Sequence, residues 1–526
     1  MGYKGGWRWA AFLLVSGLVC WVAAASAQEV PTATPSYLSD NTNNLSPANQ
    51  NSSDTFQSQL PGVVPQPTIA SPGLVTGFTL GELYTNNLAL TPPGSSHESD
   101  FITEVQPFLK SAYSSPRFSG LLDYSLTGYL YNQHSKDNQI SQNLSAQGTF
   151  TLLPQHFFLD GTALYDQQII NNAAPSGSGA YFLTNNRANA AIGVLSPYWI
   201  QDFGNAGIAS LRYSRGRVAY NVHGGIPGAS SATLSGIPDI TSNAVQFSWV
   251  SPKDTTLGWN LLYTNQRITP DFGPGAQYAS AILGGSYRLN FNTTLLADIG
   301  KENKYLPNGT VQTLGARFWD LGFEWTNTLN DVKMMAGHRF YGRSYLVSWT
   351  HNASRVTTTL SYTEQPTDYN QQLLAQNPGA MLSSPFPASQ IPSLIERQIY
   401  LSKRAAASVS YIMATSTLTA RLYDELRTFF ILNSSQERVA DAEISWLFNI
   451  GVFTAFTPTY GWQRYQYQNG QINYSTYAQL ALVHQFTPYD SGSFSVRNES
   501  RNVYFGLPGN TGYRVNILFL QWTHLF

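Results

Sequence analysis

The chain has 526 residues and a formal net charge of −1, and only 11% of its residues are charged whereas 13% are aromatic. An ordinary soluble domain carries about 25% charged residues, so the composition argues against one. The balance of 29 basic and 30 acidic residues argues against a nucleic-acid partner, which would call for a basic surface.

Residues 1–27 have the pattern of a cleaved secretory signal peptide. Lys4 and Arg8 begin it, an apolar run covers residues 9–25, and the small residues 25–27 predict cleavage after Ala27. A membrane-anchoring helix is the alternative, because the run approaches the length of a short span. Cys20, the single cysteine, lies in this segment, so the mature chain is expected to have no disulfide and no thiolate metal site.

Residues 28–72 are rich in Pro, Ser, Thr, Asn and Gln and contain few apolar residues. Such a segment cannot bury enough apolar surface to fold alone, so it predicts a disordered periplasmic leader. A small capping element is the alternative. After the signal there is no apolar run of about 18 residues, so a membrane-spanning helix is not expected.

Residues 73–526 are built from segments of roughly 10–16 residues in which apolar and polar side chains alternate. In residues 417–427, for example, Leu418 and Leu422 alternate with Arg421 and Glu425. Alternation gives a strand one apolar and one polar face, as in a membrane barrel with a wet interior. A soluble sandwich or propeller is the rival fold, but it would need a regular internal repeat or two buried apolar sheets.

The connections alternate between short turns, such as residues 154–156, and long ones, such as residues 171–185, 223–239 and 365–395. Bacterial barrels have short periplasmic turns and longer outer loops. We therefore predict an all-β, antiparallel up-and-down transmembrane barrel of about 22 strands, with a range of 18–24. Residues 331–364 make the count least certain, because the strands there look short and their connections tight.

The last segment, residues 512–526, ends on Phe526, and alternate positions before it hold His524, Trp522, Leu520 and Leu518. This resembles the carboxy-terminal signal by which the barrel-assembly machinery recognises outer-membrane proteins, with Trp522 and Phe526 as its insertion residues. It departs from that signal at His524, where an aromatic is usual. The strand is expected to pair with the first one near Phe78 and Leu80.

Two runs after the leader, residues 81–88 (GELYTNNL) and 98–107 (ESDFITEVQP), and a later stretch, residues 337–364, carry a family resemblance. They are similar to the uncharacterised PEP-CTERM system-associated outer-membrane proteins, over most of residues 76–526. The resemblance implies an outer-membrane location and an association with exopolysaccharide production, and it supplies no catalytic or binding residues.

Motifs for enzymatic chemistry are absent from the sequence. It contains neither a HExxH zinc pair nor a GxSxG elbow, Walker loop or calcium loop. We therefore predict no cofactor, no metal site and no enzyme, with a barrel hydrolase as the least favoured alternative.

Charged residues of the predicted strands are expected to face the lumen, because Arg or Lys facing lipid costs roughly 2–4 kcal/mol at the midplane. They form either cross-strand ion pairs that stiffen the wall or a selectivity ladder for a solute. Inward tyrosines such as Tyr129 and Tyr423 either fill the wall or stack on sugar rings. The charged candidates are Asp160, Asp166, Arg212, Arg421, Glu425, Arg427, Asp441, Glu443, Arg497, Glu499 and Arg501.

The longest connection, residues 365–395, includes a helix-like piece at residues 371–376. A loop of this length is unusual unless it is functional or disordered. We predict that it folds inward as a constriction or plug. The sequence as a whole predicts a porin-like conduit associated with exopolysaccharide production or export, with membrane lipid and polysaccharide as partners. The alternative is a non-conducting structural or polysaccharide-binding surface protein.

Overall fold

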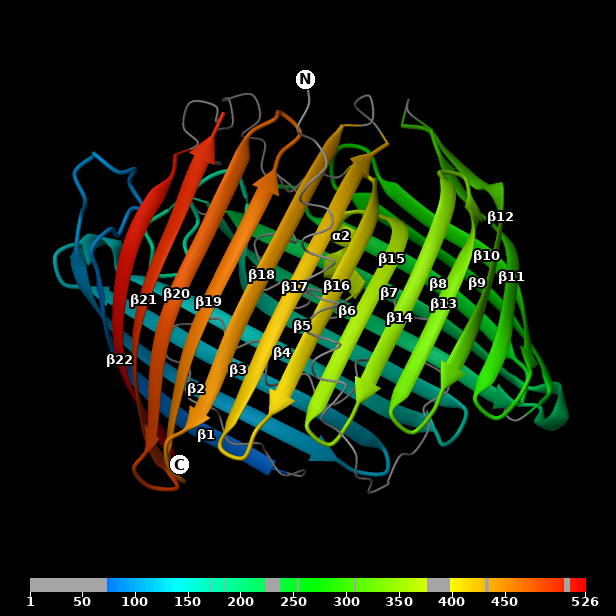
Figure 1. Ribbon diagram of the computed structural model, residues 1–526, viewed down its shortest axis with the longest axis horizontal. Coiled ribbons are helices and arrows are strands. Elements are labelled where there is room, and N and C mark those ends of the chain that lie inside the picture. Colours follow the sequence, from blue (N-terminus) through cyan, green and yellow to red (C-terminus); the bar gives the residue numbers. More distant parts are fainter. Residues whose placement is uncertain are drawn as a thin grey trace.

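The computed structural model describes residues 73–170, 172–184, 186–222, 237–252, 255–306, 309–375, 398–430, 435–505 and 511–526. The predicted signal peptide (residues 1–27) and leader (residues 28–72) lie outside the described residues, as does the larger part of the 365–395 loop. These described residues form 22 strands, one short α-helix and two 3-10 turns, and Figure 1 shows the tilted strands curving round the molecule.

The elements have the following bounds: β1 Gly73–Thr85, β2 Asp100–Ser114, β3 Phe118–Tyr131, η2 Ser135–Asp137, β4 Gln139–Leu153, β5 Phe157–Ile169, β6 Arg187–Asp202, η3 Gly204–Ala206, β7 Ile208–Val222, β8 Ile240–Val250, β9 Leu257–Pro270, β10 Ala276–Arg288, β11 Thr293–Tyr305, β12 Val311–Thr326, β13 Asn330–Arg339, β14 Gly342–Asn352, β15 Val356–Thr367, α2 Tyr369–Ala375, β16 Tyr400–Ile412, β17 Ser416–Phe429, β18 Gln436–Asn449, β19 Thr454–Gln466, β20 Ile472–Gln485, β21 Asp490–Tyr504 and β22 Tyr513–Leu525.

Each strand pairs antiparallel with the next, and β22 pairs back onto β1, so the sheet closes on itself. In the closing pair Phe78 lies opposite His524, and Leu80 lies opposite Trp522. The predicted barrel, its strand count and this pairing are therefore confirmed. Closure leaves no unpaired strand edge, which is the condition for a sheet to stand in lipid.

The region where the strand count was least certain contains the shortest strands. β13 and β14 have 10 and 11 residues, whereas β6 and β12 have 16 each. Only residues 340 and 341 connect β13 to β14, although that connection lies at the end of the barrel where most connections are long. We call this the long-loop end, and the opposite end, where β22 finishes, the short-turn end.

The two faces of the wall differ in what covers them. On β22 the outward Leu518 and Leu520 are 41% and 58% exposed, whereas the inward Ile517 and Phe519 are 1% and 4% exposed. Near the short-turn end outward aromatic rings touch in series, with Trp249 packed edge-on against Trp259 at 5.2 Å between ring centroids. An apolar outer face with aromatic rings at its rim is the surface of a membrane barrel.

Among the described residues, no helix is long and apolar enough to cross a membrane. The α-helix in this part of the chain, α2, has seven residues and lies near the start of β16 (Figure 1).

Candidate functional site in the lumen

The connection between β5 and β6 enters the barrel instead of extending away from it. We call its described residues 172–184 the β5–β6 segment. Its Tyr181 and Phe182 are each 2% exposed and belong to one apolar cluster with Leu88, Ile517 and Phe519. The inner face of β22 is therefore apolar because a loop covers it, which the strand pattern alone does not reveal.

The same segment reaches further round the inner wall. The Arg501 guanidinium of β21 donates to the carbonyl oxygens of Ala173 and Ala174, the latter at 2.6 Å. The Tyr467 hydroxyl, just after β19, donates to the Asn172 carbonyl at 3.0 Å. Arg501, predicted as a lumenal charge, thus holds a loop and is 4% exposed.

The described part of the longest connection also lies inside. Asp368 caps α2, because its carboxylate accepts a hydrogen bond from the backbone N–H of Gln371. Three neutral hydrogen bonds then tie the helix to distant strands: Tyr369 to Gln168 of β5 at 3.0 Å, Gln371 to Gln266 of β9 at 3.1 Å and Gln372 to Tyr400 of β16 at 3.0 Å.

The helix lies against β6 and β7, where Gly216 of β7 leaves the inner wall without a side chain. A Cβ added at Gly216 would stand 2.7 Å from Cδ2 of Leu374, so the glycine is what allows the close approach. Leu374 and Tyr369 are buried with Ile192, Val218 and other wall residues. Residues 368–375 therefore lie in the lumen, and the helical piece expected at 371–376 is α2.

Asp368 is an ionisable group in this contact that is fully enclosed. It is 1% exposed, and burial raises the pKa of its carboxyl from 3.8 to about 6. The hydrogen bond from the backbone N–H of Gln371 partly opposes this rise because it favours the charged form.

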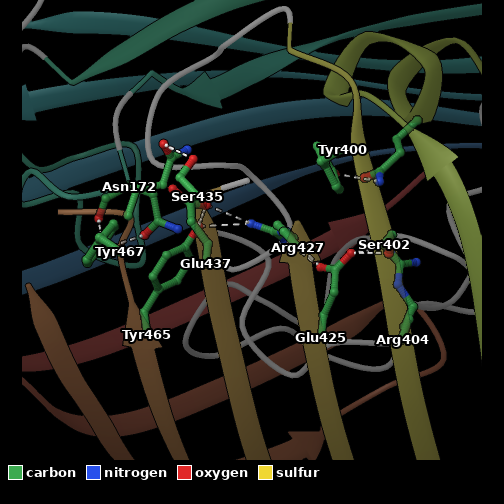
Figure 2. A network of polar contacts seen from close by, with 12 residues as sticks. Asn172, Tyr400, Ser402, Arg404, Glu425, Arg427, Ser435, Glu437, Tyr465 and Tyr467 are labelled. Carbon is green, nitrogen blue, oxygen red and sulfur yellow. Dashed lines mark hydrogen bonds and ion pairs between the residues drawn. The ribbon is translucent and has the colours of Figure 1, made fainter. Parts of the chain in front are cut away.

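A cluster of charges on β16, β17 and β18 lies beside these segments (Figure 2). Glu425 accepts two hydrogen bonds from the Arg427 guanidinium, at 2.9 and 2.7 Å, and Arg404 lies 3.4 Å from its other oxygen. On its far side Arg427 donates to the Tyr465 hydroxyl at 2.9 Å, which donates to Glu437 at 2.7 Å. Glu425, Arg427 and Glu437 are each 0% exposed, so solvent does not reach the cluster.

A second set of charges extends from β17 to β21. Arg421 lies 3.6 Å from Glu443, which also accepts a hydrogen bond from Tyr477. The guanidinium of Arg497 lies over the Tyr477 ring at 4.0 Å and 3.3 Å from Glu499. These contacts link predicted residues from separate strands into one continuous polar network.

The remaining predicted charges lie apart from that network. Asp160 and Arg212 form an ion pair at 2.6 Å between β5 and β7, on the other side of the barrel. Asp166 accepts two hydrogen bonds from the side-chain amide of Gln168. The amide oxygen of Gln168 in turn accepts a hydrogen bond from the Tyr369 hydroxyl of α2. Asp441 is 3% exposed on β18, opposite Tyr423 and Gln463 in the sheet register.

Several paired charges of the inner wall are absent from the residues predicted from the sequence. Arg339 bridges Glu302 at 2.7 Å and Asp320 at 2.6 Å, so three lumenal charges on β11, β12 and β13 went unrecognised. Arg404 and Glu437 were missed too, although their positions in the alternating pattern would have placed them on the inner face. In the parts of the chain that the structure describes, no cluster of three metal-binding side chains occurs.

Some charges face outward, contrary to the expectation that strand charges point inward. Asp424 and Arg438 pair at 2.9 Å on the outer face, with 43% and 42% of their side chains exposed. They lie in the half of their strands towards the long-loop end, where a charge can reach water or headgroups and its cost falls.

No protein-family model and no curated protein matches the chain. Solved barrels resemble it in fold. The siderophore receptor PirA from Acinetobacter baumannii has 8% identity and a TM-score of 0.48, over 88% of this chain and 81% of that one. The anion-selective porin from Comamonas acidovorans has 8% identity and a TM-score of 0.31, over 86% and 99%.

A third similar structure is OccK2 from Pseudomonas aeruginosa, solved with glucuronate. It has 9% identity and a TM-score of 0.35, over 87% of this chain and 100% of that one. At such identities the likeness is one of fold alone.

Proposed function

We propose that this barrel is a passive, porin-like conduit of the outer membrane, narrowed at its long-loop end by α2 and the β5–β6 segment. The observation that carries the proposal is how α2 is held. Its polar ties to β5, β9 and β16 are hydrogen bonds between neutral side chains, about 0.5–1.5 kcal/mol each, with no ion pair among its described residues. Such an element can narrow a lumen and still move.

For the solute we propose a polysaccharide. Charged and amide groups line the inner wall together with tyrosines. Tyr423 and Tyr477 are only 3% and 7% exposed, so a sugar chain would meet chiefly the polar groups. The resemblance to barrels associated with exopolysaccharide production points the same way, although it is an analogy of family. No catalytic step is part of the proposal.

A specific observation favours the second candidate, a non-conducting structural or polysaccharide-binding protein. Arg427 and Tyr400 are 0% exposed although they lie on the inner wall, so the inward segments seal that part of the lumen. In this case the loops would bind polysaccharide at the surface and no solute would cross.

Single-channel conductance in planar bilayers separates the two functions. The test variant is Gly216→Val, whose side chain would occupy the place of Leu374 and displace α2. The control is Gly193→Val on the neighbouring strand, where an added Cβ meets no atom within 4 Å. We expect measurable wild-type conductance, a higher value for Gly216→Val and no change for Gly193→Val.

Wild-type and Gly216→Val barrels that both fail to conduct would overturn the conduit in favour of the surface protein. Equal conductance in all three would show that α2 does not narrow the lumen. For the solute, acidic and neutral oligosaccharides added on one side should interrupt the current, and current undisturbed by either would contradict a polysaccharide conduit.

A further inference from the structure

The outer face of β7 to β14 carries an unusual distribution of charge. Its strands hold seven outward basic residues and no outward acidic one. The register places their acidic residues on the inner face: Asp298, Glu302, Asp320, Glu324 and Asp331. The outward basic residues are Arg215, Arg217, Arg267, Lys301, Lys304, Arg317 and Arg343, and all are exposed. We call them the cationic arc.

The arc lies at one level of the barrel. Its members stand seven to eleven residues from the short-turn ends of their strands. With about 3.3 Å per residue and a tilt of about 40°, nine residues rise roughly 23 Å, close to the ~25 Å height of the apolar band. The charges therefore lie near the membrane interface on the long-loop side.

Within the described residues, most of the arc has no acidic ion-pair partner. Arg217 pairs with Asp239 at 3.1 Å, but Arg215 and Arg267 have no acidic partner among the residues that the structure describes. Asn243 separates them in one cross-strand row. Lipid headgroups lie at this level of the membrane, so a headgroup phosphate can supply the counter-charge that the described residues do not.

A hollow in the wall adjoins the arc on β3 to β7, with a volume of about 840 Å³. Two cross-strand rows of small residues form its floor: Gly120, Gly148 and Gly161 in one, and Ala146, Ala163 and Gly193 in the other. The rows continue directly into Leu195 and Arg215, and into Arg217. The hollow is thus apolar along its length and cationic at the edge where it meets the arc.

We propose that the hollow and the adjoining arginines bind one phosphorylated lipid of the membrane leaflet on the long-loop side. An acyl chain lies along the glycine and alanine floor. A headgroup phosphate pairs with Arg215, which has no acidic partner among the described residues, and with the exposed N–H groups of Arg217 that its contact with Asp239 leaves open. Guanidinium groups bind phosphate through two parallel hydrogen bonds, which suits these two positions. The inference requires only that the outer face meets lipid, so it is independent of whether the lumen conducts.

Native mass spectrometry of the full barrel in detergent, titrated with bis-phosphorylated lipid A, tests the site. Arg215→Gln combined with Arg217→Gln should weaken binding about tenfold or more. The matched control, Arg464→Gln with Arg514→Gln, removes two outward arginines from β19 and β22 and should leave binding within about twofold of wild type. Each variant is first checked for the heat-modifiable migration of a folded barrel.

Two further arms separate the phosphate from the acyl chain. Lipid A without phosphates should bind the wild type as weakly as lipid A binds the arginine variant. Gly193→Leu, which fills open space on the floor, should weaken binding while leaving both arginines in place. Equal losses for the two arginine pairs, or equal binding of lipid A with and without phosphates, would overturn the site.

Discussion

Adjacent acidic residues on β17 have opposite environments. Glu425 is enclosed by Ser402, Arg404 and Arg427 and is 0% exposed, whereas Asp424 pairs with Arg438 on the half-exposed outer face. Because successive strand residues point to opposite faces, one step along the chain moves a carboxylate from a sealed ion cluster to the outer surface. The two positions therefore form a natural matched pair.

Glu425→Ala should destabilise the barrel by about 3–5 kcal/mol, because it leaves Arg427 and Arg404 buried without their shared carboxylate. Asp424→Ala should cost less than about 1 kcal/mol, since its pair is half-exposed. Urea unfolding of the barrel in lipid vesicles, followed by tryptophan fluorescence, gives both values. A cost for Glu425→Ala no greater than for Asp424→Ala would show that the cluster contributes nothing specific to stability.

For an individual residue, the sequence predicts which face of the strand it occupies but not which residue it pairs with. The alternating pattern placed Arg421, Glu425 and Arg427 on one face of their strand. In the structure Glu425 pairs with Arg427, whereas Arg421 pairs with Glu443. His524, the departure from the carboxy-terminal signal, packs between Trp522 and Phe526 and contacts Asp490 at 2.8 Å. A partner on a neighbouring strand depends on the register between the two strands, and alternation within one strand carries no information about register.

Among the elements, strands were predictable and loop paths were not. The alternation of apolar and polar residues within a strand identifies that strand without reference to any other segment. The predicted number of about 22 strands was therefore correct. The β5–β6 segment, in contrast, was recognised only as long. Its inward path depends on Arg501, more than 300 positions later in the chain, and on the apolar inner faces of β22 and β1.

The packing of α2 against the inner wall should depend on pH through Asp368. Burial raises the pKa of this carboxyl to about 6, above its ordinary 3.8. Because the pKa is raised when α2 is packed against the wall, protonation of Asp368 stabilises the packed helix. This stabilisation is complete below pH 3.8 and is lost as the pH rises through about 6. Conductance should therefore increase between about pH 4.5 and about pH 7.5, as the ionised carboxylate loosens the helix.

Asp368→Asn provides the control, because asparagine also caps helices but does not titrate. This variant should keep the low-pH conductance at both pH values. The same increase in wild type and variant would assign the pH response to another group.

At the scale of the whole molecule, the barrel depends on a seam between residues at opposite ends of the described chain. Thr79 and Thr523 lie opposite each other in β1 and β22, with their hydroxyl oxygens 3.0 Å apart on the inner face. Outside, Phe78 packs on Trp522 and Phe526 at 5.4 and 5.8 Å between ring centroids. Every other strand pair joins neighbours in sequence, so this seam alone turns the sheet into a barrel.

Thr79→Cys with Thr523→Cys should form a disulfide across the seam. Directly opposed strand residues have Cα atoms about 4.5–5.5 Å apart, within the roughly 4.4–6.8 Å that a disulfide spans. The cross-linked chain should migrate faster than its reduced form on denaturing gels. Thr79→Cys with Gln521→Cys is the control, because the diagonal pair on the same face is about 7–8 Å apart and should stay reduced. Cross-linking of the control alone would show that the register is shifted by two residues, and cross-linking of neither pair would show that the seam is open.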